Sequence, residues 1–363
     1  MTSDLVPAWR ALATAGGELM RIFAPEHGLW GIAQDMEAVG EEREPISGVP
    51  VSSLYGASPE TLSPRREHLE GLDALVVDLP DIGCRHYTFA ATLAHAMAAC
   101  EETGVEVIVC DRPNPVGGMA LEGGPVEEGF RSFVSELPVP VRHGMTLGEL
   151  SLLLKAGRHP SLALAVLPCA GWRRETWFGA TGLPWLAPSP NMPTLLTAAI
   201  YPGACLVEAT NLSEGRGTTR PFQLIGAPWV DAERLAVGLG TLALPGSHFR
   251  PTRFRPAFGK HGGKVCGGVE WHVTDPGLLR PVEAGVRLLA EVHALHPEEF
   301  AWRRGPYEFV SGVPAIDLLT GSARARDAIE GRCETVEVLE AWASYCERFR
   351  DERRGFLLYP ERV

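Results

Sequence analysis

The sequence predicts a doubly wound α/β domain followed by a smaller α+β domain. Short runs rich in Val, Ile and Leu alternate with helical patterns through the first half of the 363-residue chain. These runs are apolar on both faces, which is typical of parallel strands that helices cover. After about Phe222 the alternation gives way to a hairpin pattern and further helices. We therefore expect one domain over residues 1–222 and a smaller one over residues 223–363.

The expected parallel strands are apolar runs at 20–25, 74–80, 105–111, 162–168 and 204–209. Helices are predicted between them, at 89–103 before Gly104 and at 146–155. Thr146 followed by Glu149 fits a capping box, in which each side chain satisfies an unpaired backbone N–H of the helix start.

The second domain begins with a different pattern. Runs 253–258 and 265–274 flank a glycine-rich loop and predict an antiparallel hairpin. Helical patterns follow at 281–293 and 335–350. Strands that are followed by helices, without alternation, predict an α+β arrangement for this part of the chain.

Composition argues against several classes of function. The chain has 33 basic and 45 acidic residues and a net charge of −12, whereas nucleic-acid binding needs clustered Lys and Arg. No run approaches the roughly 20 apolar residues that span a bilayer. The start, MTSDLVPAWR, lacks the features of a signal peptide, so we expect a cytoplasmic protein. Eight single cysteines, never spaced as CxxC, argue against disulfides and structural zinc.

Polar side chains follow the expected strands. Since parallel strands end at one edge of a sheet, ligands bind outside that edge. The candidate site residues in these segments, and before the helix at 146, are Glu26, His27, Asp81, Arg85, Tyr87, Asn114, His143, Asn191, Glu208, Asn211, Glu214 and Arg216. An edge rich in carboxylates and amides suits a sugar better than an apolar ligand.

Some of these carboxylates also have structural explanations. Glu26 could cap the next helix, although its place directly at a strand end favours a functional role. Asp78 lies inside an apolar run, where burial without a partner would be costly. An ion pair with Arg85 explains Asp78 as well as catalysis does, and Asp81, beyond the strand, is the better catalytic candidate.

The next two turns allow similar alternatives. Asp111 and Arg112 lie in a rigid, proline-rich turn and are expected to pair with each other. Asn114 of the same turn remains free to reach a ligand. His143 precedes a helix, and a lone histidine is more often a hydrogen-bonded structural residue than a catalytic base.

The loop at 211–219 has the most specific pattern. Gly215 and Gly217 allow backbone amides to turn inward around Arg216, which predicts an anion-binding site. Lys260 and Lys264 flank a glycine-rich hairpin tip, and Lys260 could reach an anionic ligand from the second domain. The sequence contains no P-loop and no GxGxxG motif after the first strand, so we expect no nucleotide cofactor. The absence of GxSxG and HExxH argues against a serine hydrolase or a zinc protease.

Several of these segments resemble one known family. They read PEHGLWG, VVDLPDIGCRHYTF, DRPNPVGG, PVRHGMTLGEL, GWRRETWF, PSPNMPT, NLSEGRGTTRPF and FGKHGGKVCGGVEWHVTD. In this order they are similar to the NamZ-type peptidoglycan exo-β-N-acetylmuramidases, formerly a domain of unknown function. The resemblance runs from about Arg21 to the C-terminus and is most specific in NLSEGRGTTRPF.

The resemblance implies a Rossmann-like domain and a smaller C-terminal domain with the active-site cleft between them. It also implies removal of N-acetylmuramic acid from the non-reducing end of peptidoglycan fragments, without metal or cofactor. Members of the family usually begin with a further strand, which this sequence lacks. Either the start is truncated, in which case it could also hide an export signal, or this branch of the family dispenses with an edge strand.

Glycoside hydrolysis needs an acid for the leaving oxygen and a second group that attacks or activates water. We expect Glu26 to be the acid, because burial beside Leu29 and Trp30 would raise the pKa of its carboxyl. The second group would be Asp81, Glu208 or Glu214, with Asp81 preferred. Attack by the substrate's own acetamido group is a further alternative.

The remaining candidates are expected to bind the substrate. Tyr87, Asn114, Asn191 and Asn211 would hold sugar hydroxyls and the acetamido group, and His27 and His143 complete the predicted binding set. The lactyl carboxylate that distinguishes muramic acid needs a cation. Arg216 or Arg85 could bind it with two hydrogen bonds, with Lys260 a weaker alternative.

Two other functions remain open at this point. A non-catalytic protein that binds cell-wall sugars would use the same cleft without turnover. A metal-assisted hydrolase would use Asp78, Asp81 and Asp111 as oxygen ligands. Neither the retention of anomeric configuration nor the oligomeric state follows from the sequence.

Overall fold

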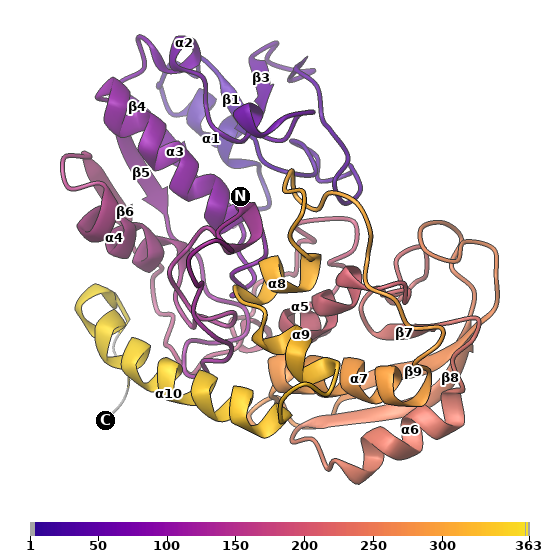
Figure 1. The fold of residues 1–363 in the computed structure, drawn as a ribbon. Helices are drawn as coiled ribbons and strands as arrows, with labels where there is room; N and C mark the ends of the chain where they lie inside the picture. Colours follow the sequence, from indigo (N-terminus) through magenta and orange to yellow (C-terminus); the bar gives the residue numbers. More distant parts are fainter. Residues whose placement is uncertain (1–3, 360, 362–363) are drawn as a thin grey trace.

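The computed structural model describes residues 4–359 and 361. Its strands form three separate three-stranded sheets (Figure 1). The first sheet contains β1 (Ile22–Ala24), β3 (Pro50–Ser53) and β2 (Glu42–Arg43), with β1 and β3 parallel. The fold is therefore mixed α/β, as predicted, although the parallel strands are divided between two small sheets. The finer Rossmann-like description stays a prediction.

The second sheet is entirely parallel and matches the prediction closely. It runs in the order β4 (Ala74–Val77), β5 (Glu106–Cys110) and β6 (Leu164–Leu167). Helices α3 (Phe89–Thr103) and α4 (Leu147–Arg158) connect these strands and pack against β5. Such helical crossovers are what parallel neighbours require.

The boundaries of these helices follow from local sequence. The predicted capping box of α4 is present, because Thr146 Oγ1 accepts from the Glu149 N–H at 3.2 Å and the Glu149 carboxylate accepts from the Thr146 N–H at 3.0 Å. Helix α3 ends at Gly104, whose φ of 75° is accessible to glycine without strain.

The expected strand at 204–209 is wrong. Helix α5 (Leu195–Ala204) continues there directly into the 3₁₀ helix η4 (Cys205–Ala209). A short apolar run cannot by itself distinguish a buried strand from a buried helical segment. Here the neighbours decide the outcome, since α5 crosses α7 (Pro281–Leu295) so closely that a Cβ on Gly203 would lie 1.7 Å from the Pro281 carbonyl oxygen.

The third sheet contains the predicted hairpin. Strands β8 (Ser247–Phe254) and β9 (Cys266–Val273) pair antiparallel, and β7 (Leu224–Ala227) joins the other edge of β9. The first hairpin strand thus ends at Phe254, and the expected strand at 253–258 was placed too far along the chain.

The other elements cover these sheets or connect them. They are α1 (Ala8–Thr14), η1 (Pro59–Leu62), α2 (Arg66–Leu69), η2 (Phe133–Ser135), η3 (Phe178–Ala180), α6 (Ala232–Thr241), α8 (Ala315–Thr320), α9 (Arg324–Ile329), α10 (Thr335–Arg353) and η5 (Arg354–Phe356). The largest apolar core joins residues from both sides of position 222, from Ile82 to Trp342. The domain boundary near 222 stays a prediction. Within the described chain, no helix has both the length and the apolar character needed to cross a membrane.

Candidate active site

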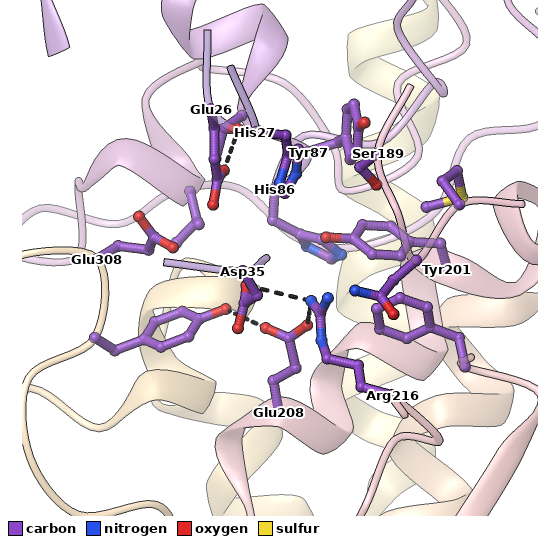
Figure 2. A pocket seen from close by; sticks show the side chains of 16 residues that line it. Glu26, His27, Asp35, His86, Tyr87, Ser189, Tyr201, Glu208, Arg216 and Glu308 are labelled. Carbon is purple, nitrogen blue, oxygen red and sulfur yellow. Dashed lines mark hydrogen bonds and ion pairs between the residues drawn. The ribbon is translucent and has the colours of Figure 1, made fainter. Parts of the chain in front are cut away.

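A polar pocket forms where loops from distant parts of the chain meet. Its lining comes from the segment after β1, the start of α3, the loop before α5, η4, the glycine-rich loop at 211–219 and the loop before α8. Both Glu26 and Arg216 line the pocket (Figure 2). Of the other predicted site residues, His27, Tyr87, Asn191 and Glu208 also line it.

Glu26 lies directly after β1 and is buried, with 4% of its surface exposed. Its Oε2 accepts from the Thr88 hydroxyl at 2.7 Å, and its Oε1 accepts from the Met36 N–H at 3.2 Å. The next residue, His27, has a φ of 74° and places its ring Nδ1 2.9 Å from the Ala33 carbonyl oxygen. This turn directs the chain that follows back over the pocket.

Asp35 lies on that returning segment and was missed by the sequence analysis. Its Oδ1 is 3.2 Å from Arg216 Nη2, and 26% of its side chain is exposed. Burial, and then the charge of Glu208, raise the pKa of Asp35 to about 7, although Arg216 acts in the opposite direction. Asp35 is therefore a carboxyl that can carry a proton near neutral pH.

Glu308 enters the pocket from the loop before α8. Burial and the nearby charges of Glu26 and Asp35 raise the pKa of Glu308 well above its ordinary value. Its Oε2 accepts from the Tyr55 hydroxyl at 2.9 Å. Oxygen atoms of Glu26, Asp35 and Glu308 all lie within 4.8 Å of one another, so these three could in principle hold a metal ion. We call them the three-carboxylate cluster.

Arg216 occupies the opposite side of the pocket from Glu26 and Glu308 (Figure 2). Its Nη2 is 2.5 Å from Glu208 Oε1, and its guanidinium carbon lies 5.0 Å from the centre of the Phe222 ring. Tyr307 donates from its hydroxyl to Glu208 Oε2 at 2.9 Å. Burial acts to raise the pKa of Glu208, but the charge and hydrogen bond of Arg216, together with Lys260 and Tyr307, outweigh burial and lower it.

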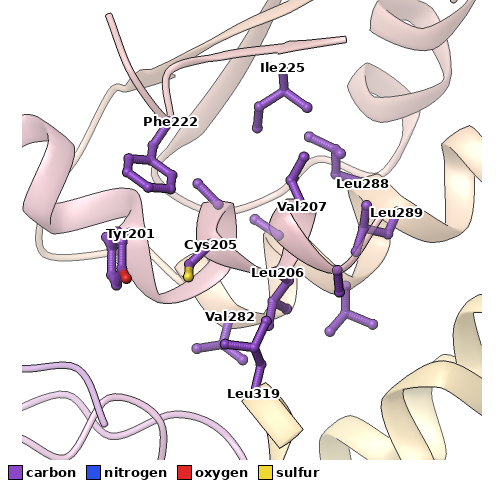
Figure 3. Packing of buried hydrophobic residues seen from close by; sticks show 14 of the residues in the cluster. Tyr201, Cys205, Leu206, Val207, Phe222, Ile225, Val282, Leu288, Leu289 and Leu319 are labelled. Atoms are coloured by element: carbon purple, nitrogen blue, oxygen red, sulfur yellow. The ribbon is translucent and has the colours of Figure 1, made fainter. Parts of the chain in front are cut away.

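Packing of η4 sets the position of Glu208. Leu206 and Val207 of η4 are fully buried among side chains of α7 and α8, including Leu288 and Leu319 (Figure 3). Glu208 follows them and points away from this apolar core toward Arg216. The helical form of 204–209, which the sequence analysis did not expect, thus brings a carboxylate to the pocket.

Behind Arg216, two more predicted residues form a supporting layer. Glu214 lies 3.5 Å from Arg216 Nε, and the Lys260 ammonium group lies 3.0 Å from Glu214 Oε2. Lys260 also donates to the backbone carbonyl oxygens of Val207 and Glu208, each at 3.2 Å. Neither Glu214 nor Lys260 lines the pocket.

Tyr87, Ser189 and Asn191 also line the pocket. Asn191 donates from Nδ2 to Gln34 Oε1 at 2.9 Å, which ties the Asp35 segment to the loop before α5. Burial raises the pKa of the Tyr87 hydroxyl, so it stays protonated and able to donate.

Besides Glu214 and Lys260, five other predicted site residues lie outside the pocket. Arg85 is fully buried and donates to the backbone carbonyl oxygens of Gly124, Val139 and Leu319. Burial lowers the pKa of its guanidinium to about 10. Arg85 therefore holds three segments of backbone together.

The two asparagines among these five also bind backbone. Asn114 donates to the Met145 carbonyl oxygen at 3.0 Å and accepts from the Val116 N–H. Asn211 donates to the Glu299 carbonyl oxygen and accepts from the Ala301 N–H.

The last two, Asp81 and His143, lie beside each other. Asp81 Oδ2 accepts from the Gly83 N–H at 2.7 Å and is 3.6 Å from His143 Nε2. His143 Nδ1 accepts from the Met145 N–H at 3.2 Å. These contacts stabilise the turn after β4.

Two predicted ion pairs are wrong. Asp78 pairs with Arg112, with its Oδ1 2.5 Å from Arg112 Nη2, and not with Arg85. Asp111 does not pair with Arg112 but accepts from Thr146, Gly148 and Tyr359. The oxygen set proposed for a metal, Asp78, Asp81 and Asp111, is thus dispersed among separate partners.

Tyr307 and Glu308 were also not predicted from the sequence. They lie in a loop with no strand before it and no motif around it, so no local signal distinguishes them from other loop residues. Asp35 had a weak signal, since it is a carboxylate in the glycine-containing segment directly after Glu26.

Comparison with known proteins identifies the family of this site. Residues 1–196 match the family described as exo-beta-N-acetylmuramidase NamZ, N-terminal, and residues 199–359 match its C-terminal counterpart. The chain belongs to the NamZ family. It is 40% identical over 342 residues to the peptidoglycan beta-N-acetylmuramidase NamZ of Bacillus subtilis (strain 168), which covers 94% of this chain and 80% of the relative.

Solved structures agree with this assignment. A DUF1343 family protein from Bacteroides fragilis NCTC 9343 superposes with a TM-score of 0.88 at 34% identity, over 99% of this chain and 91% of its own. A second DUF1343 protein of the same strain gives 0.73 at 29% identity, over 99% and 92%. The NamZ fold therefore extends over nearly the whole chain.

Proposed function

We propose that this NamZ-family protein is an exo-β-N-acetylmuramidase that releases N-acetylmuramic acid from the non-reducing end of peptidoglycan fragments. The observation that carries the proposal is the convergence of Glu26, Asp35 and Arg216 on one pocket. A glycosidase needs two carboxyl groups near one bond, and a muramic acid also brings its own carboxylate. The Bacillus relative, named for this activity, supports the same conclusion.

The two catalytic carboxyls have different environments, which suggests different roles. Glu26 accepts two hydrogen bonds, and such bonds stabilise an ionised carboxylate. Asp35, with its pKa raised to about 7, is suited to donate a proton to the leaving oxygen. We therefore assign Asp35 as the general acid and Glu26 as the carboxylate that attacks or stabilises the anomeric carbon. This assignment differs from the expectation from the sequence, in which Glu26 was the acid.

The spacing of these carboxyls favours retention of configuration. Their oxygen atoms lie within 4.8 Å of each other. Inverting enzymes hold the two carboxyls roughly 6.5–9.5 Å apart to admit a water, whereas retaining enzymes use about 5–5.5 Å. Glu26 attacks the anomeric carbon and forms a glycosyl ester while the glycosidic bond breaks and Asp35 gives its proton to the leaving oxygen. Water then attacks the same carbon, gives a proton to the Asp35 carboxylate and displaces Glu26, which releases the sugar and restores both carboxyls.

Arg216 is the proposed partner of the lactyl carboxylate. Among the described residues that line the pocket, it is the cation, and Glu208 orients it. Tyr87 and Asn191 line the same pocket and would hold sugar hydroxyls and the acetamido group. The proposed contribution of His27 is mainly its turn conformation, which brings the following segment, with Asp35, back to the pocket. Arg85, Asn114, His143, Asn211 and Lys260 would support the site without touching the sugar.

We further propose that hydrolysis needs no metal. In the three-carboxylate cluster, Glu26 and Glu308 already accept hydrogen bonds from Thr88 and Tyr55, and Asp35 lies beside a cation. Proton transfer between these groups supplies the chemistry. A chelator should therefore leave the rate unchanged, whereas loss of activity that added Zn²⁺, Mg²⁺ or Ca²⁺ restores would contradict this part of the proposal.

The direct test is cleavage of a chromogenic β-N-acetylmuramide by the purified chain, with the matching β-N-acetylglucosaminide as the control substrate. We expect release of N-acetylmuramic acid and poor cleavage of the glucosaminide. Arg216→Met should reduce kcat/KM for the muramide but not for the glucosaminide. Tight binding of N-acetylmuramic acid to the folded protein without any turnover would favour a sugar-binding protein instead.

A further inference from the structure

Glu308 is held in the pocket by an unusual backbone. Glu308 and Phe309 have consecutive φ values of 46° and 64°, in the left-handed region that residues other than glycine seldom adopt. Tyr307 and Val310 exchange backbone hydrogen bonds of 3.0 and 2.9 Å across this turn. The Phe309 ring packs against Tyr55 with ring centres 5.6 Å apart. The surrounding structure therefore maintains a strained turn whose result is to present Glu308 to the pocket.

The groups that face Glu308 are mostly acidic. Glu26 follows β1, Asp35 lies on the segment returning from it, and Glu208 belongs to η4. Tyr55, which follows β3, donates its hydroxyl to Glu308, and Tyr307 precedes it in the chain. None of the ion pairs in the described part of the chain includes Glu308, and the pocket's cation, Arg216, contacts Asp35 and Glu208 instead.

Three carboxylates this close cannot all be ionised in a buried site. Their oxygen atoms lie within 4.8 Å of one another, so like charges would repel strongly at low local polarity. Glu26 has two hydrogen-bond donors that favour its charge, and Asp35 has Arg216. Glu308, with a single tyrosine hydroxyl and 4% exposure, is the member least able to remain charged.

We propose that Glu308 is a positioning residue that stays neutral and thereby allows Glu26 to be ionised while Asp35 exchanges its proton. This inference rests on the proposed function for its catalytic meaning. A third negative charge beside Glu26 and Asp35 would make Asp35 too weak an acid to protonate the leaving oxygen. A neutral Glu308 fills the same space, keeps the Tyr55 contact and avoids that repulsion.

The first test measures the charge of Glu308 without any substrate. A neutral Glu308 binds a proton in the folded state that the unfolded chain releases above about pH 4.3. Folding stability should then decline with rising pH, and Glu308→Gln should remove that decline. We expect the folding equilibrium constant of the wild type to fall, relative to Glu308→Gln, roughly tenfold per pH unit between about pH 5 and 7. Urea unfolding at several pH values measures this.

A matched control is Glu102→Gln, an exposed position on α3. It should show the same pH dependence as the wild type. Parallel curves for the wild type and Glu308→Gln would mean that Glu308 is already ionised in the folded protein, and would overturn the inference. This test is independent of activity, so it remains decisive even if no muramide is cleaved.

The second test measures catalysis. Glu308→Gln resembles the neutral acid and should keep kcat/KM within about threefold of wild type at pH 6, with the alkaline limb of its pH profile unchanged or extended. Glu308→Leu, which loses the contact with Tyr55, should lose at least about tenfold in kcat. A large loss in Glu308→Gln, together with stabilisation of the wild type by added divalent cation, would mean that the cluster binds a metal and would overturn the inference.

Discussion

The pocket and the carboxyl end of β5 both bury carboxylates, but these carboxylates have fewer partners in the pocket than at β5. At β5, Asp111 accepts from the Thr146 hydroxyl, the Gly148 N–H and the Tyr359 hydroxyl, at 2.7, 2.8 and 2.7 Å. Nearby, Glu149 pairs with the fully buried Arg174 and accepts from backbone N–H groups of the C-terminal segment. Each charge there has its partners within the protein, which is what a buried charge needs to be stable.

The pocket leaves its carboxyls with fewer partners. Glu308 has one hydrogen-bond donor from Tyr55, and Asp35 shares Arg216 with Glu208. Burial, which these few partners do not offset, raises the pKa values of Asp35 and Glu308. Both regions follow parallel strands, so position at a strand end does not distinguish function from structure. What distinguishes the two regions is the number of hydrogen-bonding and charged partners that each carboxyl has within the protein.

Glu26→Gln is the change expected to have the largest effect. It removes the proposed attacking carboxylate but keeps the shape of the side chain and the contact with Thr88. We expect kcat/KM for the muramide to fall about 10³-fold, or roughly 4 kcal/mol, with little change in stability. Glu37→Gln, an exposed position of the same segment, is the control. Near-normal turnover by Glu26→Gln would remove Glu26 from the role.

Asp111→Ala tests the structural role of the carboxylate at the end of β5. It leaves three donors without their acceptor, and the helix start at Thr146 loses an interaction. We expect a loss of about 3 kcal/mol in the free energy of unfolding, since each buried unsatisfied group costs about 1–3 kcal/mol. The kcat of the remaining folded enzyme should be close to wild type. Urea unfolding and active-site assays separate the two, with exposed Asp73→Ala as control. A specific loss of kcat without loss of stability would contradict a purely structural role.

Asp35→Asn sharpens the assignment of the acid. An acid with its pKa raised to about 7 is protonated and active below that pH, so wild-type activity should decline as pH rises through 7. Asn cannot donate the proton, and we expect about a 10²-fold lower kcat with no decline between pH 6 and 8. The kcat profile of both proteins measures this. An alkaline limb that persists in Asp35→Asn belongs to another group.

Thr146→Ala has the smallest expected effect. The Thr146 hydroxyl both caps α4 and donates to Asp111, so its removal should lower the free energy of unfolding by about 1.5 kcal/mol. Thr146→Ser keeps the hydroxyl and should recover most of this loss. If both variants are equally destabilised, the methyl group and not the cap carries the effect. Activity should be unaffected in either variant.

Much of the fold could be predicted because its signals are local. The apolar runs of β4, β5 and β6, the start of α4 at Thr146 and the end of α3 at Gly104 each depend on a few neighbouring residues. The segment 204–209 could not be assigned in this way. Its side chains are buried on all sides, so periodicity gives no answer and the crossing of α5 with α7 determines its helical form.

The same distinction between local signals and distant contacts applies to the site residues. Six predicted residues line the pocket, namely Glu26, His27, Tyr87, Asn191, Glu208 and Arg216. Arg85 and Asn114 had the right chemistry and neighbourhood in the sequence, yet their polar atoms bind backbone. Which partner a buried polar group finds depends on residues that are distant in the chain, such as Leu319 for Arg85.

Motifs and periodicity are properties of neighbouring residues, so they were enough to predict the family, the mixed α/β class and the segments that carry Glu26 and Arg216. That Asp35 and Glu308 join Glu26, and that Asp111 does not, follows from contacts between distant parts of the folded chain. The physical reason is that the charge state of a carboxyl is set by burial and by the donors and charges around it. Those surroundings are assembled from loops about 10 to 280 residues apart in the chain.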